Sequence, residues 1–155
     1  MSNPMAELRL QALRADAVEY GMEPSDELPN VFGVVMDMAF PNGTATLVTF
    51  AEGTTSLYTS TGSGIIGGGG YQQVVQAAHT LLRTAEEHLD AFAPDTSVEP
   101  PAAGSVTIRV LTHKGRLAVT EDNNVLGEGH SPASPVFHAA HGVLTELRQI
   151  DEAQS

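Results

Sequence analysis

The 155-residue chain contains no cysteine and no tryptophan. The absence of cysteine excludes disulfides, thiolate nucleophiles, zinc sites built on cysteine and thiol redox sensing. A chain without disulfides is typical of a reducing compartment, so the sequence indicates a cytoplasmic protein. The chain is also long enough to bury a core without a disulfide or a bound metal.

Long apolar runs and basic clusters are missing as well. No apolar segment approaches the roughly 18 residues that span a bilayer, and no basic segment followed by an apolar one opens the chain, so we expect neither membrane insertion nor secretion. Lys114 is the single lysine among seven Lys and Arg residues. Nucleic acid is therefore not an expected partner, because binding to its backbone requires clustered Lys and Arg.

The residues that are present describe an acidic globular chain. Hydrophobic residues make up 41% of the sequence and charged residues only 17%, which favours one compact domain over disorder. The formal net charge is −12 and the sequence pI is about 4.6. Such a charge favours solubility and attracts basic partners.

Three helices are expected from apolar residues at helical spacing. They cover residues 3–20, 71–92 and 134–150, and the last begins with Ser134 as its N-cap followed by Pro135. Gly21 is the expected C-terminal stop of the first helix.

Five strands are expected where β-branched and aromatic residues gather between turn signals. They cover residues 31–40, 44–50, 54–60, 106–112 and 116–120, and a further short strand is expected near Val125. The order α-βββ-α-ββ-α predicts an α+β fold, with helices packed on one antiparallel sheet of about five strands.

The chain also predicts a repeated hairpin-loop-helix unit within a single domain, residues 1–155. Residues 31–92 form a first half and residues 105–150 a second half, joined by a proline-containing connector at 93–104. At a constant offset of 62 residues, both hairpin glycines and both Ala-Ala-His triplets coincide. The offset indicates either an ancient duplication or a structural pseudo-symmetry, and chance similarity of two amphipathic helices is the alternative.

A glycine-rich loop between the third strand and the second helix is the candidate ligand site. Its glycines are Gly62, Gly64, Gly67, Gly68, Gly69 and Gly70. The loop matches G-x-G-x-x-G, but no parallel strand-helix-strand unit surrounds it and three glycines delay the helix, so a dinucleotide is not expected. Backbone amides of the loop could bind an anion, whereas the structural alternative is a bend at a sheet edge.

Catalytic and metal-binding patterns are weak. His138 and His141 lie three residues apart on the last helix, which lacks the spacing and the glutamate of H-E-x-x-H. His113 and His130 lie beside a turn and in a loop, and the chain contains no G-x-S-x-G elbow. We therefore expect no enzyme, no metal and no cofactor; an enzyme that uses these four histidines is the alternative.

Two stretches of the sequence resemble a group of uncharacterised bacterial proteins. They are residues 57–69, LYTSTGSGIIGGG, and residues 135–141, PVFHAAH. This resemblance implies no activity. The order of elements resembles that of small acidic type III secretion chaperones and the YbjN-like fold, which implies a homodimer that binds an extended segment of another protein. The layout also resembles roadblock and profilin-like layers, with the strand numbers before and after the middle helix reversed.

The sequence therefore predicts a non-catalytic protein-binding, scaffold or chaperone-like module that forms a homodimer. A small-ligand or anion-binding domain centred on residues 62–70 is the first alternative. An inhibitor of the immunity or antitoxin kind is the second, because such proteins are often small and acidic.

Overall fold

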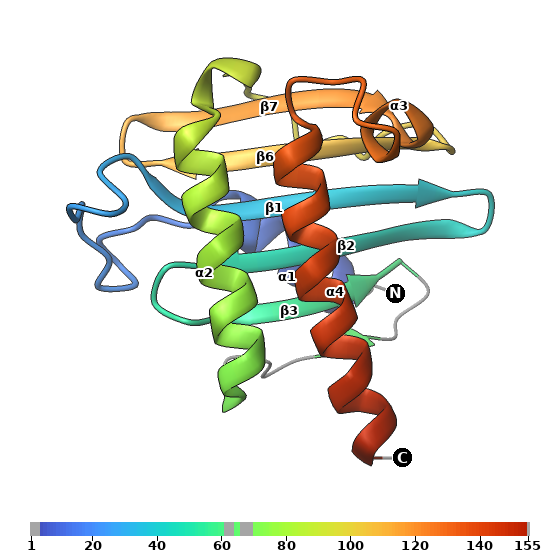
Figure 1. Cartoon of the computed structure of the whole chain (residues 1–155), viewed down its shortest axis with the longest axis horizontal. Helices are drawn as coiled ribbons and strands as arrows, with labels where there is room; N and C mark the ends of the chain where they lie inside the picture. The colour runs from blue at the N-terminus through green and yellow to red at the C-terminus, as the bar shows by residue number, and fades with distance from the viewer. Residues whose placement is uncertain (1–3, 61–63, 66–69, 155) are drawn as a thin grey trace.

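One antiparallel sheet carries all the strands, and the α+β fold is confirmed. The computed structural model describes residues 4–60, 64–65 and 70–154. Helices α2 and α4 lie side by side on one face of the sheet, and α1 lies behind it (Figure 1). None of the described helices has the length and apolar character needed to cross a membrane.

The strand order in the sheet is β4-β3-β2-β1-β6-β7-β5. The strands are β1 (Val31–Phe40), β2 (Gly43–Phe50), β3 (Thr55–Thr59), β4 (Gly64–Ile65), β5 (Ala93–Pro94), β6 (Ser105–Thr112) and β7 (Gly115–Asp122). The five long strands follow the sequence prediction closely. The two edge strands, β4 and β5, are two residues long each and carry too little pattern to be predicted.

The helices are α1 (Pro4–Leu13), α2 (Gln72–Glu87), α3 (Asn123–Gly127) and α4 (Ser134–Gln154), with a short 3₁₀ turn η2 (Leu89–Ala91) after α2. Two hairpins carry positive-φ glycines at their turns, Gly53 at +113° and Gly115 at +135°. A side chain at either position would strain the backbone, so these glycines fix where β2 turns into β3 and β6 into β7.

The main core lies between the sheet and the pair α2 and α4. Alternate residues of the strands point toward the helices because side chains alternate across a strand. The side chains of Val34, Met36, Leu47, Ile108 and Val110 belong to this core. They pack against an apolar stripe on each helix. The helical spacing of these apolar residues is the pattern that predicts the two helices from the sequence.

A second core lies on the opposite face, under α1 and the turns that follow it. Ala12, Leu13 and Ala17 pack there against residues of β1 and β2 such as Val35 and Phe50. This face is smaller and more polar than the first, because charged residues occupy the centre of two of its strands. It therefore holds the features from which a site is built below.

Three predicted segments differ from the structure. The helix expected over 3–20 ends at Leu13, and Gly21, at φ +70°, closes a later turn rather than this helix. The helix expected over 71–92 ends at Glu87 and is followed by η2. The segment near Val125 is the helix α3, because the Asp122 side chain accepts hydrogen bonds from the Asn124 and Val125 N–H groups and caps a helical turn.

The two hairpin-loop-helix units recur in order, but in space they are mirror-like. Strands β2 and β6 flank β1 on its two sides, each antiparallel to it, with β3 and β7 outside them. Both helices nevertheless cover the same face (Figure 1). No rotation can superpose units of opposite hand. The 62-residue offset therefore aligns the buried Val74 with Val136, but it equates Leu47 on the helix face with Arg109 on the α1 face.

The carboxylate of Glu86 fastens the start of β1 to α2. It accepts hydrogen bonds from the Asn30 and Val31 N–H groups at 2.7 and 2.9 Å, and from the Asn30 side-chain amide at 2.9 Å. Burial alone would raise the pKa of Glu86, but these hydrogen bonds, with His113 nearby, lower it below its ordinary value of 4.5.

Replacing Glu86 by glutamine tests this contact through pH. A carboxyl group whose pKa is lowered by folding stabilises the protein above its unfolded pKa, and this contribution is lost as pH falls through the folded pKa. We expect Glu86→Gln to lower the free energy of unfolding at pH 7 and to narrow its difference from wild type below about pH 4. Urea denaturation across this range measures both effects, and parallel profiles for the two proteins would contradict the assignment.

Gly33 in β1 is required by close packing. A Cβ built on it would lie 2.7 Å from Cδ1 of the Phe50 ring and 3.1 Å from the Thr49 carbonyl oxygen. We expect Gly33→Ala to lower the free energy of unfolding by about 1–3 kcal/mol. Gly142, inside α4 with open space around its Cβ position, is the matched control, and Gly142→Ala should raise that free energy by up to about 1 kcal/mol. Equal effects in urea denaturation would show that the space at Gly33 is not limiting.

Candidate functional site

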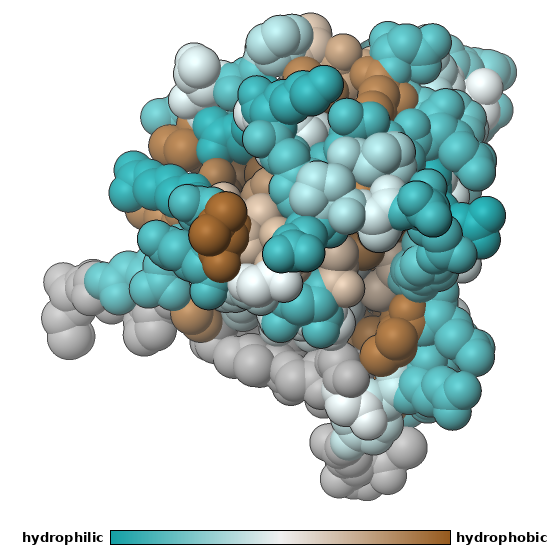
Figure 2. Space-filling model, turned by 90° about the vertical axis from the view of Figure 1, so that its left-hand side faces the viewer, coloured by the Kyte–Doolittle hydropathy of each residue, from teal (hydrophilic) through white to brown (hydrophobic). Residues whose placement is uncertain are grey.

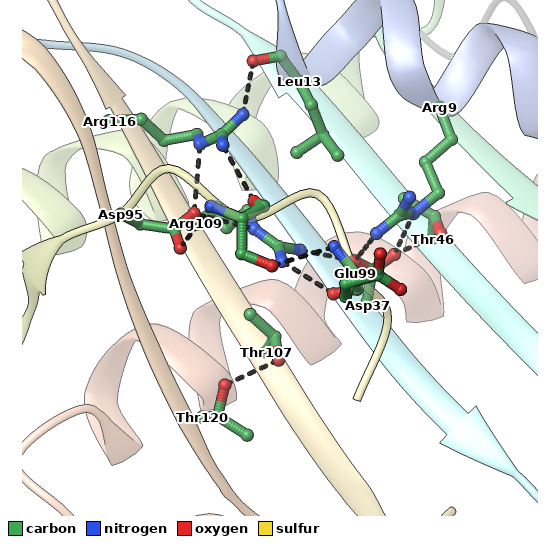
Figure 3. Close-up of polar contacts among 11 residues, drawn as sticks. Arg9, Leu13, Asp37, Thr46, Asp95, Glu99, Thr107, Arg109, Arg116 and Thr120 are labelled. Atoms are coloured by element: carbon green, nitrogen blue, oxygen red, sulfur yellow. Dashed lines mark hydrogen bonds and ion pairs between the residues drawn. The ribbon is translucent and has the colours of Figure 1, made fainter. Parts of the chain in front are cut away.

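Asp37 lies at the centre of the α1 face, in the middle of the central strand, and its side chain is fully buried. Arg9 of α1 binds it with two nitrogens, at 2.9 Å from Nε to Oδ1 and 2.6 Å from Nη2 to Oδ2. Arg109 of β6 donates to Oδ2 at 2.8 Å, and the Thr46 hydroxyl of β2 donates to Oδ1. One carboxylate therefore joins α1 to the three central strands (Figure 3).

The network continues from Arg109 to the connector that follows the second helix. Asp95 accepts hydrogen bonds on Oδ2 from the Nε atoms of Arg109 and Arg116, at 3.0 and 3.1 Å. Arg109 Nη2 also donates to the Glu99 carbonyl oxygen at 2.8 Å. These bonds hold the connector across the β6–β7 hairpin, on the same face as α1 (Figure 3).

Arg116 fixes the end of α1. Its Nη1 donates to the Leu13 carbonyl oxygen at 2.9 Å, and its Nη2 donates to the Ser97 carbonyl oxygen at 2.8 Å. A cation at the C-terminus of a helix satisfies a free carbonyl and complements the helix dipole. This contact explains why α1 stops at Leu13, where apolar periodicity alone predicts a longer helix.

A hollow of about 280 Å³ opens beside the end of α1. Its apolar lining comes from Leu13, Ala17, Val18, Phe32 and Leu111, and its polar lining from Asp16, Thr112, His113 and Arg116. Val18 is 83% exposed, although the residue before it is buried. We call this depression the Val18 hollow.

An acidic segment, residues 16–27, runs from this hollow toward β1. It contains five acidic residues, all of them exposed: Asp16, Glu19, Glu23, Asp26 and Glu27. Residues 15–78 contain no Lys, Arg or His. Two of the four large exposed hydrophobic residues in the described chain, Val18 and Tyr20, lie in the same segment. Figure 2 looks at this end of the molecule and shows hydrophobic side chains set singly among hydrophilic ones.

The internal network makes this surface more acidic than the sequence suggests. Three of the seven basic residues, Arg9, Arg109 and Arg116, are turned inward with only two of the 19 acidic residues. Within the described chain, every ion pair between a carboxylate and Lys or Arg involves Asp37 or Asp95. Among the described residues, these exposed carboxylates have no Arg or Lys partner, and Oε2 of Glu27 lies 2.9 Å from Nε2 of His79.

The predicted glycine loop is described only in part. Gly64 forms the two-residue edge strand β4 with Ile65, opposite Tyr58 and Leu57 of β3. A Cβ added at Gly70 would meet no atom within 4 Å. The other four predicted positions, Gly62, Gly67, Gly68 and Gly69, lie outside the described residues, so a ligand site at this loop stays a prediction.

The four histidines singled out in the sequence do not converge. His113 lies at the Val18 hollow, with its ring 5.4 Å from that of Phe32. His130 lies 3.6 Å from the Glu128 carboxylate at the surface, and Nε2 of His138 lies 3.2 Å from the Gly127 carbonyl oxygen. Among the described residues, no group of three or more His, Asp or Glu side chains is arranged to hold a metal ion.

His141 is placed by packing. Its ring meets the Phe137 ring edge to face at 4.4 Å, and its Nε2 is buried without a hydrogen-bond partner among the described residues. Burial, followed by the nearby charges of Arg148 and His138, lowers the pKa of His141 below its ordinary value of 6.5. Burial therefore favours the neutral form of the ring, as expected of a histidine that packs against an aromatic side chain.

The arrangement on the α1 face is suited to binding. The Val18 hollow, which has both apolar and polar lining residues, lies beside exposed carboxylates, and such a surface can accept apolar and basic side chains together. Compared with known proteins, the chain matches no family model, no curated protein and no solved structure.

Sequence reasoning missed the buried network, although a signal for it exists. Asp37 is the single charged residue in β1 and Arg109 the single charged residue in β6, each within an otherwise apolar or hydroxyl-bearing strand. Isolated charges of opposite sign in two buried strands predict an ion pair, because a buried charge requires a partner. The third member, Arg9, lies in a helix where an arginine carries no such signal.

Removing the central carboxylate should destabilise the protein strongly. Asp37→Ala leaves the buried Arg109 guanidinium with fewer negative partners than it needs, and we expect the free energy of unfolding to fall by about 3–5 kcal/mol. Asp26→Ala, at an exposed aspartate that has no ion pair within the described part of the chain, should change it by less than about 0.5 kcal/mol. Urea denaturation at pH 7 compares the two, and similar small losses would show that Asp37 does not hold the network.

Proposed function

We propose that the protein is a non-catalytic protein-binding module that binds a partner segment rich in basic residues with an apolar anchor. The observation that carries the proposal is the acidic segment beside the Val18 hollow, together with the internal network that holds Arg9, Arg109 and Arg116, three of the chain's seven basic residues. Carboxylates on the segment attract basic side chains of the partner, and the hollow receives an apolar one. Neither interaction requires catalytic chemistry.

Charge and shape contribute in different ways. Five exposed carboxylates within twelve residues favour encounter with a basic partner, and this attraction weakens as salt concentration rises. The Val18 hollow supplies apolar area, which supports affinity when the partner's side chain fills it. A basic toxin bound by an inhibitor and a basic segment held by a chaperone both fit this chemistry; the identity of the recovered partner distinguishes them.

Charge reversal on the acidic segment tests the proposal. The site variant combines Glu19→Lys, Glu23→Lys and Asp26→Lys, and the control variant combines Glu87→Lys, Asp90→Lys and Glu128→Lys at exposed positions elsewhere. Tagged proteins are recovered gently from their own host, and native mass spectrometry measures the bound partner. We expect wild type and control to retain a basic protein partner and the site variant to lose it, with at least a tenfold fall in occupancy.

A second pair of variants isolates the apolar part. Val18→Asp alters the hollow, and Val75→Asp, at a 38% exposed position on α2, is its control. The proposal predicts that only the first variant loses the partner while both remain folded. Recovery of a partner in equal amounts by all the variants, or a strict monomer without any protein partner, would contradict it. The homodimer expected from the sequence is read from the same spectra, as a mass of two 16.3 kDa chains.

A further inference from the structure

A second, smaller pocket lies between α1 and the far ends of β2 and β3, at about 170 Å³. It is lined by Arg9, Thr44, Thr46, Tyr58, Thr59, Ser60 and Pro100. The lining comes from four separate parts of the chain that the Asp37 network holds together. We call it the Arg9 pocket; it plays no part in the protein-binding surface proposed above.

Arg9 lines this pocket and has an unused donor. Its Nε and Nη2 bind Asp37, whereas its Nη1 has no hydrogen-bond partner among the described residues. The side chain of Arg9 is only 14% exposed. A guanidinium group has five N–H donors in a planar fork, so a largely buried one with a free nitrogen favours an oxygen acceptor at that position.

The net charge of the network also favours a negatively charged ligand. Arg9 and Arg109 share the carboxylate of Asp37, and Arg109 and Arg116 share that of Asp95. Three guanidinium groups thus face two carboxylates in a largely buried region, which leaves one positive charge in excess. Because charges interact more strongly away from bulk water, a single bound negative charge would stabilise this region.

The polar lining also includes hydroxyl groups. The Thr46 hydroxyl already donates to Asp37, but the hydroxyls of Thr44 and Tyr58 have no partner among the described residues. Tyr58 is only 8% exposed, so its side chain is largely buried at the wall of the pocket. Free hydroxyls beside a guanidinium are suited to bind the two oxygens of a carboxylate.

The rest of the pocket selects a small ligand with an apolar part. The Tyr58 ring and Pro100 offer apolar surface to a ligand tail. Pockets for drug-sized ligands measure about 300–1,000 Å³, so this one admits only a few carbon atoms beside the charged group. A phosphate dianion suits it less, because its extra charge and oxygens would remain unpaired against apolar walls.

We propose that the Arg9 pocket binds a small monocarboxylate with a short apolar tail, held by Nη1 of Arg9 and the hydroxyls of Thr44 and Tyr58. The carboxylate balances the excess charge of the arginine network, and the tail lies against the Tyr58 ring and Pro100. The group comes either from a free short-chain acid or from the C-terminus of a peptide that ends in a small apolar residue.

Titration with butyrate, followed by amide resonances in two-dimensional NMR, tests the proposal. Butyramide, which has a similar shape without the charge, is the ligand control. We expect butyrate to shift the resonances of Thr44, Thr46 and Tyr58 with a Kd of about 1 mM, and butyramide to bind at least tenfold more weakly. A short peptide with a free C-terminus and the same peptide amidated distinguish the two sources of the carboxylate.

Variants locate the binding groups. Arg9→Gln should weaken butyrate binding by tenfold or more, and Thr44→Val and Tyr58→Phe by about two- to tenfold each. Thr145→Val on α4 and Tyr20→Phe at the surface are the matched controls and should leave the Kd unchanged. Because Arg9→Gln also loosens α1, the two hydroxyl variants decide the result where that variant unfolds.

Several results would overturn the proposal. Equal binding of butyrate and butyramide would exclude recognition of the charge. Shifts that map elsewhere, or that survive both hydroxyl variants, would place the ligand outside the Arg9 pocket. If neither butyrate nor the peptide with a free C-terminus shifts any pocket resonance at about ten times the expected Kd, the pocket does not bind a carboxylate.

Discussion

The α1 face is organised around the buried carboxylate of Asp37. A charge without water must be paired, and here its partners come from residues 28 and 72 positions away in the sequence. A shift of one residue in the pairing of β6 with β1 would move Arg109 to the α2 and α4 face, into the main core. The ion pair thus favours this strand register, whereas its net contribution to stability is small, because a buried pair costs nearly as much desolvation as it returns.

The same network explains which parts of the fold the sequence predicts. The strands 31–40 and 106–112 are predicted well because they are apolar and β-branched runs between turn signals, buried on both faces. The helix beginning near residue 134 is predicted well because its apolar residues recur at helical spacing. The end of α1 is not predicted, because Arg116, more than a hundred residues away, satisfies the Leu13 carbonyl oxygen. The Val18 hollow and the Arg9 pocket are likewise formed by tertiary contacts. The isolated charges Asp37 and Arg109 signal the buried ion pair in advance, but not these two depressions.

The two hairpin-loop-helix units align in sequence, but they are not equivalent in the structure. Both hairpins flank β1 and both helices return to the same face, so the two units have opposite hand. The helices agree at the 62-residue offset because each needs apolar residues at the same spacing under the same sheet. Aligned residues of the strands point to opposite faces of the sheet. Leu47 of the first unit points toward α2 and α4, whereas its aligned residue in the second unit, Arg109, points toward α1. The two faces of the sheet consequently differ in chemistry: one is an apolar core, and the other is polar.

That difference connects the interior of the protein to its surface. Arg14 is exposed beside the acidic segment, and further exposed arginines would neutralise more of it and compete with a basic partner. Because Asp37 and Asp95 hold Arg9, Arg109 and Arg116 inside, the exterior is more acidic and positive charge is concentrated behind α1. The two proposed binding regions therefore have opposite preferences, a basic protein segment outside and a carboxylate inside. They also share one support, because Arg9 forms the inner pocket while Arg116 holds the end of α1 from which the acidic segment departs.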